Sequence, residues 1–145
     1  MYQKILVPLD GSEFAECSLD HVITLLKRTK RGEVILFKVL DPIFWCRAGC
    51  DFVAFRNIEF RQAEKYLEKV KSKLVSEGIH VRSEISEGGV PAPCIVKYAK
   101  DNDVDLIIIA SHGLTGINKM MLGSVALEVL HDSHVPVLLI RPRVC

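Results

Sequence analysis

The chain has 145 residues, 49% of them hydrophobic, and a formal net charge of +1. This length is typical of one domain, and the composition supplies a full hydrophobic core. Charges of both signs are mixed along the chain, which argues against the basic stripe of a nucleic-acid-binding protein. No run of about 18 apolar residues is present, so we expect no membrane span. We therefore expect one domain over residues 1–145, with no nucleic-acid or membrane partner.

The N-terminus and the cysteines favour a cytoplasmic location. The first residues, MYQKILVPLD, lack the long apolar region and the cleavage site of a signal peptide. The five cysteines are odd in number and irregularly spaced, which is no disulfide framework. We expect five reduced thiols.

The first forty residues predict a strand, a helix and a second strand. KILVPLD is a continuous apolar strand that ends at Asp10. Ser12 is a candidate N-cap for a helix, whose apolar stripe consists of Ala15, Leu19, Val22 and Leu26. EVILFKVLD is the second strand and ends near Asp41. Such continuous apolar strands are typical of parallel sheets that are covered on both faces.

The next segment, from Asp41 to Arg56, has no clear period but carries four aromatic residues, Phe44, Trp45, Phe52 and Phe55. Structureless connections of this length are uncommon and often functional, and exposed apolar clusters mark interaction surfaces. We expect a mobile flap whose Phe44–Phe55 part selects a ligand or protein partner. An extra lobe of core and an extension of the next helix are the alternatives. Cys46 and Cys50 lack the second pair that a zinc site needs.

The middle of the chain predicts a helix, an edge strand and another helix. The apolar stripe of the first helix, which should end at Gly78, consists of Phe60, Ala63, Leu67, Val70 and Leu74. IHVRSEIS alternates apolar and polar residues, which indicates an edge strand with one wet face. Val90-Pro91-Ala92-Pro93 begins the next helix, because proline suits a first turn.

The last third predicts a strand, a long connection, a helix and a final strand. DLIIIAS is apolar throughout, and so is the final strand, PVLLI. Between Ala110 and Ser124 the connection is far longer than the roughly two to six residues of an ordinary strand-to-helix turn. The helix after it begins near Ser124 and is marked by Val125, Val129 and Leu130. This alternation of strands and helices predicts an open, mostly parallel α/β sheet.

In such sheets, ligands bind beyond the carboxyl ends of the strands, where the strand order reverses. The helix that starts at Gly123 and Ser124 would aim free N–H groups at this crevice, which suits a phosphate. Gly113 and Gly123 would let phosphate oxygens approach the main chain. Asp10 is either a ligand for a base or sugar, or a turn residue. Gly123 and Ser124 either bind phosphate or cap the helix.

Several common catalytic and phosphate-binding patterns are absent. The sequence contains no G-x-x-x-x-G-K-[ST], no G-x-G-x-x-G after the first strand and no G-x-S-x-G. Asp10, Ser111 and His112 have the residue types of a hydrolytic set, but these types occur in most sequences and do not by themselves indicate catalysis. His131 and His134 favour a charge near a helix C-terminus over a metal site.

The long connection resembles a motif of the universal stress proteins. The ATP-binding branch of that family carries G-x2-G-x9-G-[ST] after the fourth strand, and the same register here reads Ala110-x2-Gly113-x9-Gly123-Ser124. SHG and MLGS sit where the family has them. KILVPLDGSE, VILFKVLD and VPVLLIRP resemble its first, second and closing strands. The resemblance covers the whole chain.

This resemblance implies an α/β fold with an open five-stranded parallel sheet of order 3-2-1-4-5 and helices on both faces. It implies an adenine nucleotide across strands 1 and 4: ATP, alone or with Mg or Mn. The first strand end would flank adenine and ribose, the second strand would meet the adenine edge, and the last helix would hold the phosphates. The residues of this site are Pro8, Leu9, Asp10, Val39, Ala110, His112, Gly113, Gly123, Ser124 and Val125.

Ala110 departs from the pattern, because the ATP-binding branch has a glycine there. Alanine adds a methyl group and disfavours a positive φ. If the ribose packs closely at this position, affinity falls; if the backbone is ordinary strand, little changes.

The implied function is that of a nucleotide-binding regulatory module of the stress response. The alternatives are an interaction module of the same fold without nucleotide, and a slow ATP hydrolase. Arg82 and Glu84 guard one predicted sheet edge with charge, whereas VPVLLI at the other edge is apolar. The resemblance also implies pairing through the last strand in many members. We therefore expect a homodimer through Pro136–Ile140.

Overall fold

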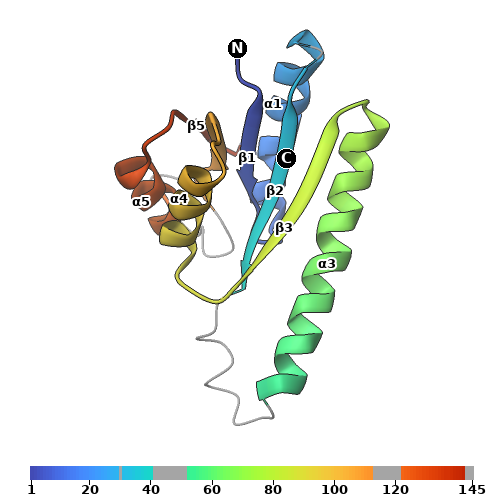
Figure 1. Ribbon diagram of the computed structural model, residues 1–145, viewed down its shortest axis with the longest axis vertical. Helices are drawn as coiled ribbons and strands as arrows, with labels where there is room; N and C mark the ends of the chain where they lie inside the picture. Colours follow the sequence, from blue (N-terminus) through green and yellow to red (C-terminus); the bar gives the residue numbers. More distant parts are fainter. Residues whose placement is uncertain (30, 41–51, 113–121, 143–145) are drawn as a thin grey trace.

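The computed structural model describes residues 1–29, 31–40, 52–112 and 122–142. Strands and helices alternate along the chain (Figure 1). Their bounds are β1 Lys4–Pro8, α1 Glu13–Thr29, β2 Glu33–Leu40, α3 Phe52–Ser76, β3 His80–Glu87, α4 Pro91–Asp101, β4 Leu106–Ala110, α5 Ser124–Asp132 and β5 Val137–Ile140. None of the described helices is long and apolar enough to cross a membrane.

The five strands form one parallel sheet in the order β3-β2-β1-β4-β5, which confirms the expected fold and strand order. Helices α1 and α3 cover one face, and α4 and α5 cover the other (Figure 1). Successive residues of a strand point to opposite faces. Val34 and Leu36 therefore enter the core under α1 and α3, while Ile35 and Phe37 enter the core under α4. This explains why β2 is apolar without alternation.

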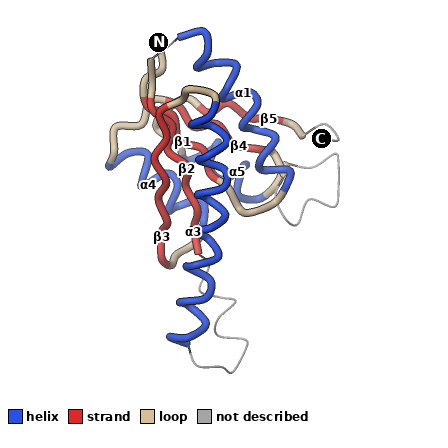
Figure 2. The backbone as a smooth tube through the Cα atoms, turned by 90° about the vertical axis from the view of Figure 1, so that its right-hand side faces the viewer, coloured by secondary structure: helices blue, strands red, loops and turns tan. Residues whose placement is uncertain are grey.

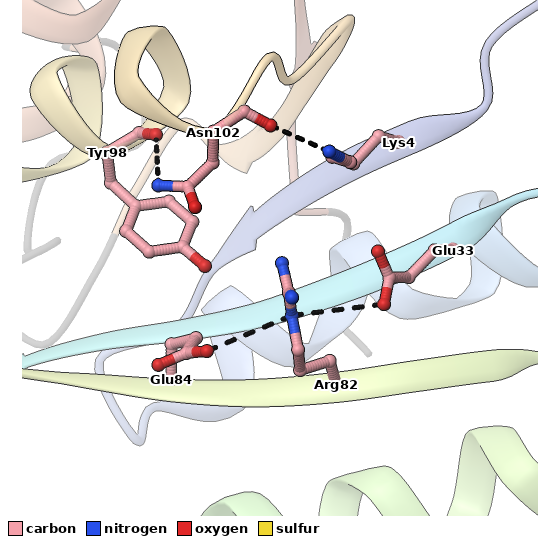
Figure 3. Close-up of polar contacts among 6 residues, drawn as sticks. All are labelled: Lys4, Glu33, Arg82, Glu84, Tyr98 and Asn102. Carbon is pink, nitrogen blue, oxygen red and sulfur yellow. Dashed lines mark hydrogen bonds and ion pairs between the residues drawn. The ribbon is translucent and has the colours of Figure 1, made fainter.

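The two edge strands differ in character. β3 is polar and half-exposed: Arg82 lies 3.8 Å from the carboxylates of both Glu33 and Glu84 (Figure 3). β5 is apolar, but Leu138 is 39% exposed. The expectation that PVLLI is covered on both faces is therefore only partly right, because an edge strand has a neighbour on one side only.

Two helices differ from their predicted limits or faces. α3 begins at Phe52, so residues 52–56, assigned to the flap, are helical. Phe55 packs with Phe60 and Ile85 against Leu40 and Ala63, as in the helix-extension alternative. Figure 2 shows the first turns of α3 extending beyond the sheet. In α5, Leu130 is 45% exposed, and the buried residues are Ala126 and Val129.

Other expectations for the flap and the cysteines lie partly outside the described residues. This applies to residues 41–51, with Phe44, Trp45, Cys46 and Cys50. Cys17 is disulfide-bonded, so the expectation of five reduced thiols is wrong, although Cys94 is a free thiol. Cysteine pairing depends on which residues the fold brings together, and spacing along the chain does not reveal this.

Asp105 ties the start of β1 to the start of β4. Its carboxylate accepts hydrogen bonds from the backbone N–H groups of Gln3 (2.7 Å) and Lys4 (3.1 Å). These contacts join segments about a hundred residues apart in the sequence. They fix where β1 enters the sheet, at the end opposite to the predicted site.

We predict that Asp105→Ala lowers the free energy of unfolding by about 1–3 kcal/mol, because it leaves two backbone donors without their charged acceptor. Asp101→Ala is the control, since Asp101 pairs with Lys97 on the surface of α4, and such exposed pairs contribute little to stability. Urea unfolding measures both. An equal fall in the free energy of unfolding in both variants would contradict the structural role of Asp105.

Candidate functional site

The pairing between the two central strands, β1 and β4, ends before their carboxyl ends. β1 pairs with β2 along all five of its residues, Lys4–Pro8, but with β4 only at Ile5 and Leu6. The helix after β1 lies on one face and the helix after β4 on the other, so the strand order reverses between them. Open α/β sheets bind ligands at such a reversal. Of the predicted site residues, Pro8 ends β1 and Ala110 ends β4, and Gly123, just before α5, is hydrogen-bonded to Ser111.

The turn between β1 and α1 is held by its own polar groups. The Asp10 carboxylate oxygen Oδ1 accepts hydrogen bonds from the Ser12 backbone N–H (2.9 Å) and from Ser12 Oγ (2.6 Å). Ser12 Oγ in turn accepts from the Ala15 N–H, which confirms the predicted N-cap. Gly11 has φ +91°, a conformation that favours glycine. Asp10 is thus a turn residue whatever else it contacts.

Two further side chains lie under this turn. The ammonium group of Lys38, on β2, donates to the Asp10 backbone carbonyl at 3.1 Å. It also lies 5.9 Å from the ring centroid of Tyr66, on α3. Burial lowers the pKa of Lys38, while Asp10 and Glu59 oppose this shift. Burial, together with the negative charge of Glu16, raises the pKa of the Tyr66 hydroxyl.

The start of α5 is held against the end of β4. The Gly123 backbone N–H donates to the Ser111 carbonyl at 2.6 Å, and Gly123 is the N-cap of α5. A Cβ at Gly123 would lie 2.9 Å from that carbonyl oxygen, closer than real contacts allow. The glycine is therefore required by main-chain packing. Ser124 follows as an exposed residue in the first turn, where free N–H groups suit an anion.

Ala110 lies in ordinary strand conformation. It pairs with Ile140 of β5 and is only 7% exposed. Within the described part of the chain, the one residue other than glycine with a positive φ is Asp103. Ala110 therefore needs no glycine-like backbone. By the alternation along β4, its methyl group shares the face of Ile108, under α1 and α3.

Ser111 and His112 do not form an accessible nucleophile. Ser111 Oγ lies 2.8 Å from His112 Nδ1, but the serine is only 1% exposed. A hydrolytic serine must reach its substrate, and this one is packed inside the protein.

The other predicted site residues differ in how far they are buried. Pro8 and Leu9 are buried, and Val125 is half-buried. Val39 lies on β2, on the far side of β1 from β4, and pairs with Ser86 of β3. Gly113 lies outside the described residues. Sequence reasoning missed Lys38, whose only signal was a lysine inside the apolar run VILFKVL.

A surface hollow of about 750 Å³ lies elsewhere, where the C-terminal ends of α4 and α5 meet. Its lining includes Lys97, Lys100, His131 and His134. These side chains are exposed, and two carboxylates, Asp101 and Asp132, pair with Lys97 and His131. The carboxyl ends of β1 and β4 are the better candidate, because the strand order reverses there and α5 begins beside β4.

Comparison with known proteins gives the family. The model of the universal stress protein family matches residues 1–141. Universal stress protein MJ0577 of Methanocaldococcus jannaschii is 37% identical over 159 residues, which cover 99% of this chain and 97% of that protein. The solved structure of MJ0577 has a TM-score of 0.90 and covers 100% of this chain and 99% of that one.

Two more distant structures share the fold and contain nucleotides. A universal stress protein in complex with cAMP is 20% identical, with a TM-score of 0.71, over 98% of both chains. One from Arabidopsis thaliana with AMP bound is 18% identical, with a TM-score of 0.73, over 98% of this chain and 93% of that one. The matches in sequence and in fold run over nearly the whole chain, and the chain belongs to the universal stress protein family.

Proposed function

We propose that this chain binds an adenine nucleotide in the crevice between β1 and β4, and acts as a regulatory module of the stress response. The observation that carries the proposal is the start of α5, which the Gly123–Ser111 hydrogen bond holds at the end of β4. A helix N-terminus at a strand-order reversal suits a phosphate. The cAMP and AMP bound to two relatives of the same fold support adenine as the base.

In this proposal each segment has one task. The turn at Leu9 and Asp10 flanks the adenosine part, and the backbone of Val39 meets the adenine edge. The phosphates lie over the first turn of α5, at Ser124 and Val125, with Gly113 and His112 completing the site. ATP, alone or with Mg²⁺ or Mn²⁺, is the ligand that the resemblance to the ATP-binding branch implies. The cytoplasmic location remains a prediction.

We predict that ATP binds the wild-type protein and that Ser124→Asp weakens this binding by about tenfold or more, because two like charges about 4 Å apart repel by about 1–4 kcal/mol. The same substitution should leave the melting temperature unchanged or higher, since a carboxylate in a first helical turn is favourable. Calorimetry with and without Mg²⁺ measures the affinity. The affinity for AMP, which carries fewer phosphates, should fall less than the affinity for ATP.

Ser124→Ala is the matched control, because it removes the hydroxyl without adding charge. It should weaken binding far less than the aspartate. If wild-type protein binds neither ATP nor AMP at millimolar concentration, the nucleotide proposal fails and an interaction module of the same fold takes its place. Steady release of phosphate from bound ATP would favour the slow hydrolase.

We also propose a homodimer through β5. Leu138 is exposed on this edge strand, and Leu127 and Leu130 are exposed on the neighbouring α5. An apolar edge strand leaves backbone donors and acceptors ready to pair with another strand. The charged β3 edge offers no such surface, because Arg82 lies between Glu33 and Glu84.

We predict that Leu138→Lys converts the dimer to a monomer in light scattering at micromolar concentration. Since the side chain is already half-exposed, the monomer should keep its fold by circular dichroism. Val75→Lys is the control, because Val75 is a similarly exposed apolar residue on α3, far from β5. A wild-type protein that is monomeric at this concentration would refute the dimer.

A further inference from the structure

Lys38 lies on a covered face of the sheet, where a charged group costs free energy. Its neighbours on the same face of β2, Val34 and Leu36, are completely buried, and α1 and α3 cover this face. Burying a charged group costs free energy unless it is paired and hydrogen-bonded. The partners of the Lys38 ammonium group should therefore explain why a lysine stands here.

These partners belong to the turn between β1 and α1. The ammonium donates to the Asp10 carbonyl at 3.1 Å, and a Cβ on Gly11 would lie 3.8 Å from it. From the other side it approaches the ring of Tyr66, within the range of a cation–π contact. The carboxylates of Asp10 and Glu59 favour the charged form of Lys38. Lys38 thus joins the end of β2 to the turn that follows β1.

The same two segments carry the proposed contacts to adenosine. Val39, whose backbone would meet the adenine edge, is the next residue after Lys38, and its side chain faces the other core. Asp10, in the turn, is held at both ends: Ser12 binds its carboxylate, and Lys38 binds its carbonyl. A shift of the turn relative to β2 would change the gap into which the base must fit.

We propose that Lys38 is a positioning residue for nucleotide binding: its ammonium group ties the β1–α1 turn to the end of β2 and sets the spacing between the two segments that contact adenosine. This inference rests on the proposed function and concerns its adenosine half. Lys38 itself touches no nucleotide.

The test compares two lysines that make the same kind of contact. Lys38→Met keeps an aliphatic chain of similar length and removes the ammonium. Lys4→Met is the control, because the Lys4 ammonium donates to the Asn102 carbonyl at 2.8 Å, at the opposite end of β1 (Figure 3). Lys38→Arg keeps a cationic donor and should restore most of the function of Lys38.

We expect Lys38→Met to weaken the binding of adenosine, AMP and ATP by the same factor, roughly five- to tenfold, as for the loss of one hydrogen bond. Lys4→Met should leave all three affinities unchanged. A loss that grows from adenosine to ATP would show that Lys38 acts only as a distant positive charge, and would overturn the proposal. Equal losses in both methionine variants would overturn it as well.

Hydrogen exchange tests the turn without any nucleotide. The Ser12 amide, which donates to Asp10, should exchange several-fold faster in Lys38→Met. The Ile107 amide, bonded to Pro136 on the other side of the sheet, should not change. Unchanged exchange at Ser12 overturns the proposal. If wild-type protein binds no nucleotide but Ser12 responds, the proposed function fails while the tie between Lys38 and the turn stands.

If Lys38→Met does not fold, a measurement on the wild-type protein still tests the proposal. An ammonium group held in hydrogen bonds shows slowly exchanging protons in a nitrogen-labelled sample, whereas a solvated one exchanges too fast to be seen. A visible Lys38 ammonium signal that shifts when adenosine binds supports the proposal. The absence of such a signal overturns it.

Discussion

The end of pairing between β1 and β4 beyond Leu6 is the constraint on which the proposed site depends. Strand β1 is bound along its whole length to β2, so the pairing ends early on the β4 side alone. Pro8, at the end of β1, has no backbone N–H to donate to a neighbouring strand. This end of pairing lies where the chain changes from one face of the sheet to the other, which is where open α/β sheets bind ligands.

Two sets of hydrogen bonds fix the segments that follow β4 and β1. On the β4 side, the hydrogen bond between Gly123 and Ser111 holds the start of α5 beside the strand end. On the β1 side, the turn is held by Ser12 through the Asp10 carboxylate and by Lys38 through the Asp10 carbonyl. In the proposed site, the hydrogen bond of Gly123 lies at the phosphate end, and the contacts of Lys38 lie at the base end. Because they lie on different strands and different faces, their effects on affinity should be separable.

Much of the fold could be predicted from local patterns, because its strands are apolar runs and its helices have regular stripes. The stripe of α1 and the cap at Ser12 are examples. Contacts between distant segments could not be predicted in this way: nothing in the sequence around Asp105 or Lys38 indicates which backbone groups they bind. The start of α3 at Phe52 could be predicted only as an alternative, since its first turns extend beyond the sheet and lack a regular stripe.

The glycine pattern of the family combines two kinds of constraint that a sequence cannot separate. At Gly123 the fold itself excludes a side chain, because a Cβ would collide with the Ser111 carbonyl. At position 110 the backbone is ordinary strand, and alanine is accommodated with its methyl group buried. The glycine at position 123 is required by packing, so its presence is no evidence for a ligand. The alanine at position 110 fits an ordinary strand, so the loss of that glycine does not exclude a ligand. The ligand must therefore be argued from groups that the fold leaves exposed at the crevice, above all the first turn of α5 at Ser124.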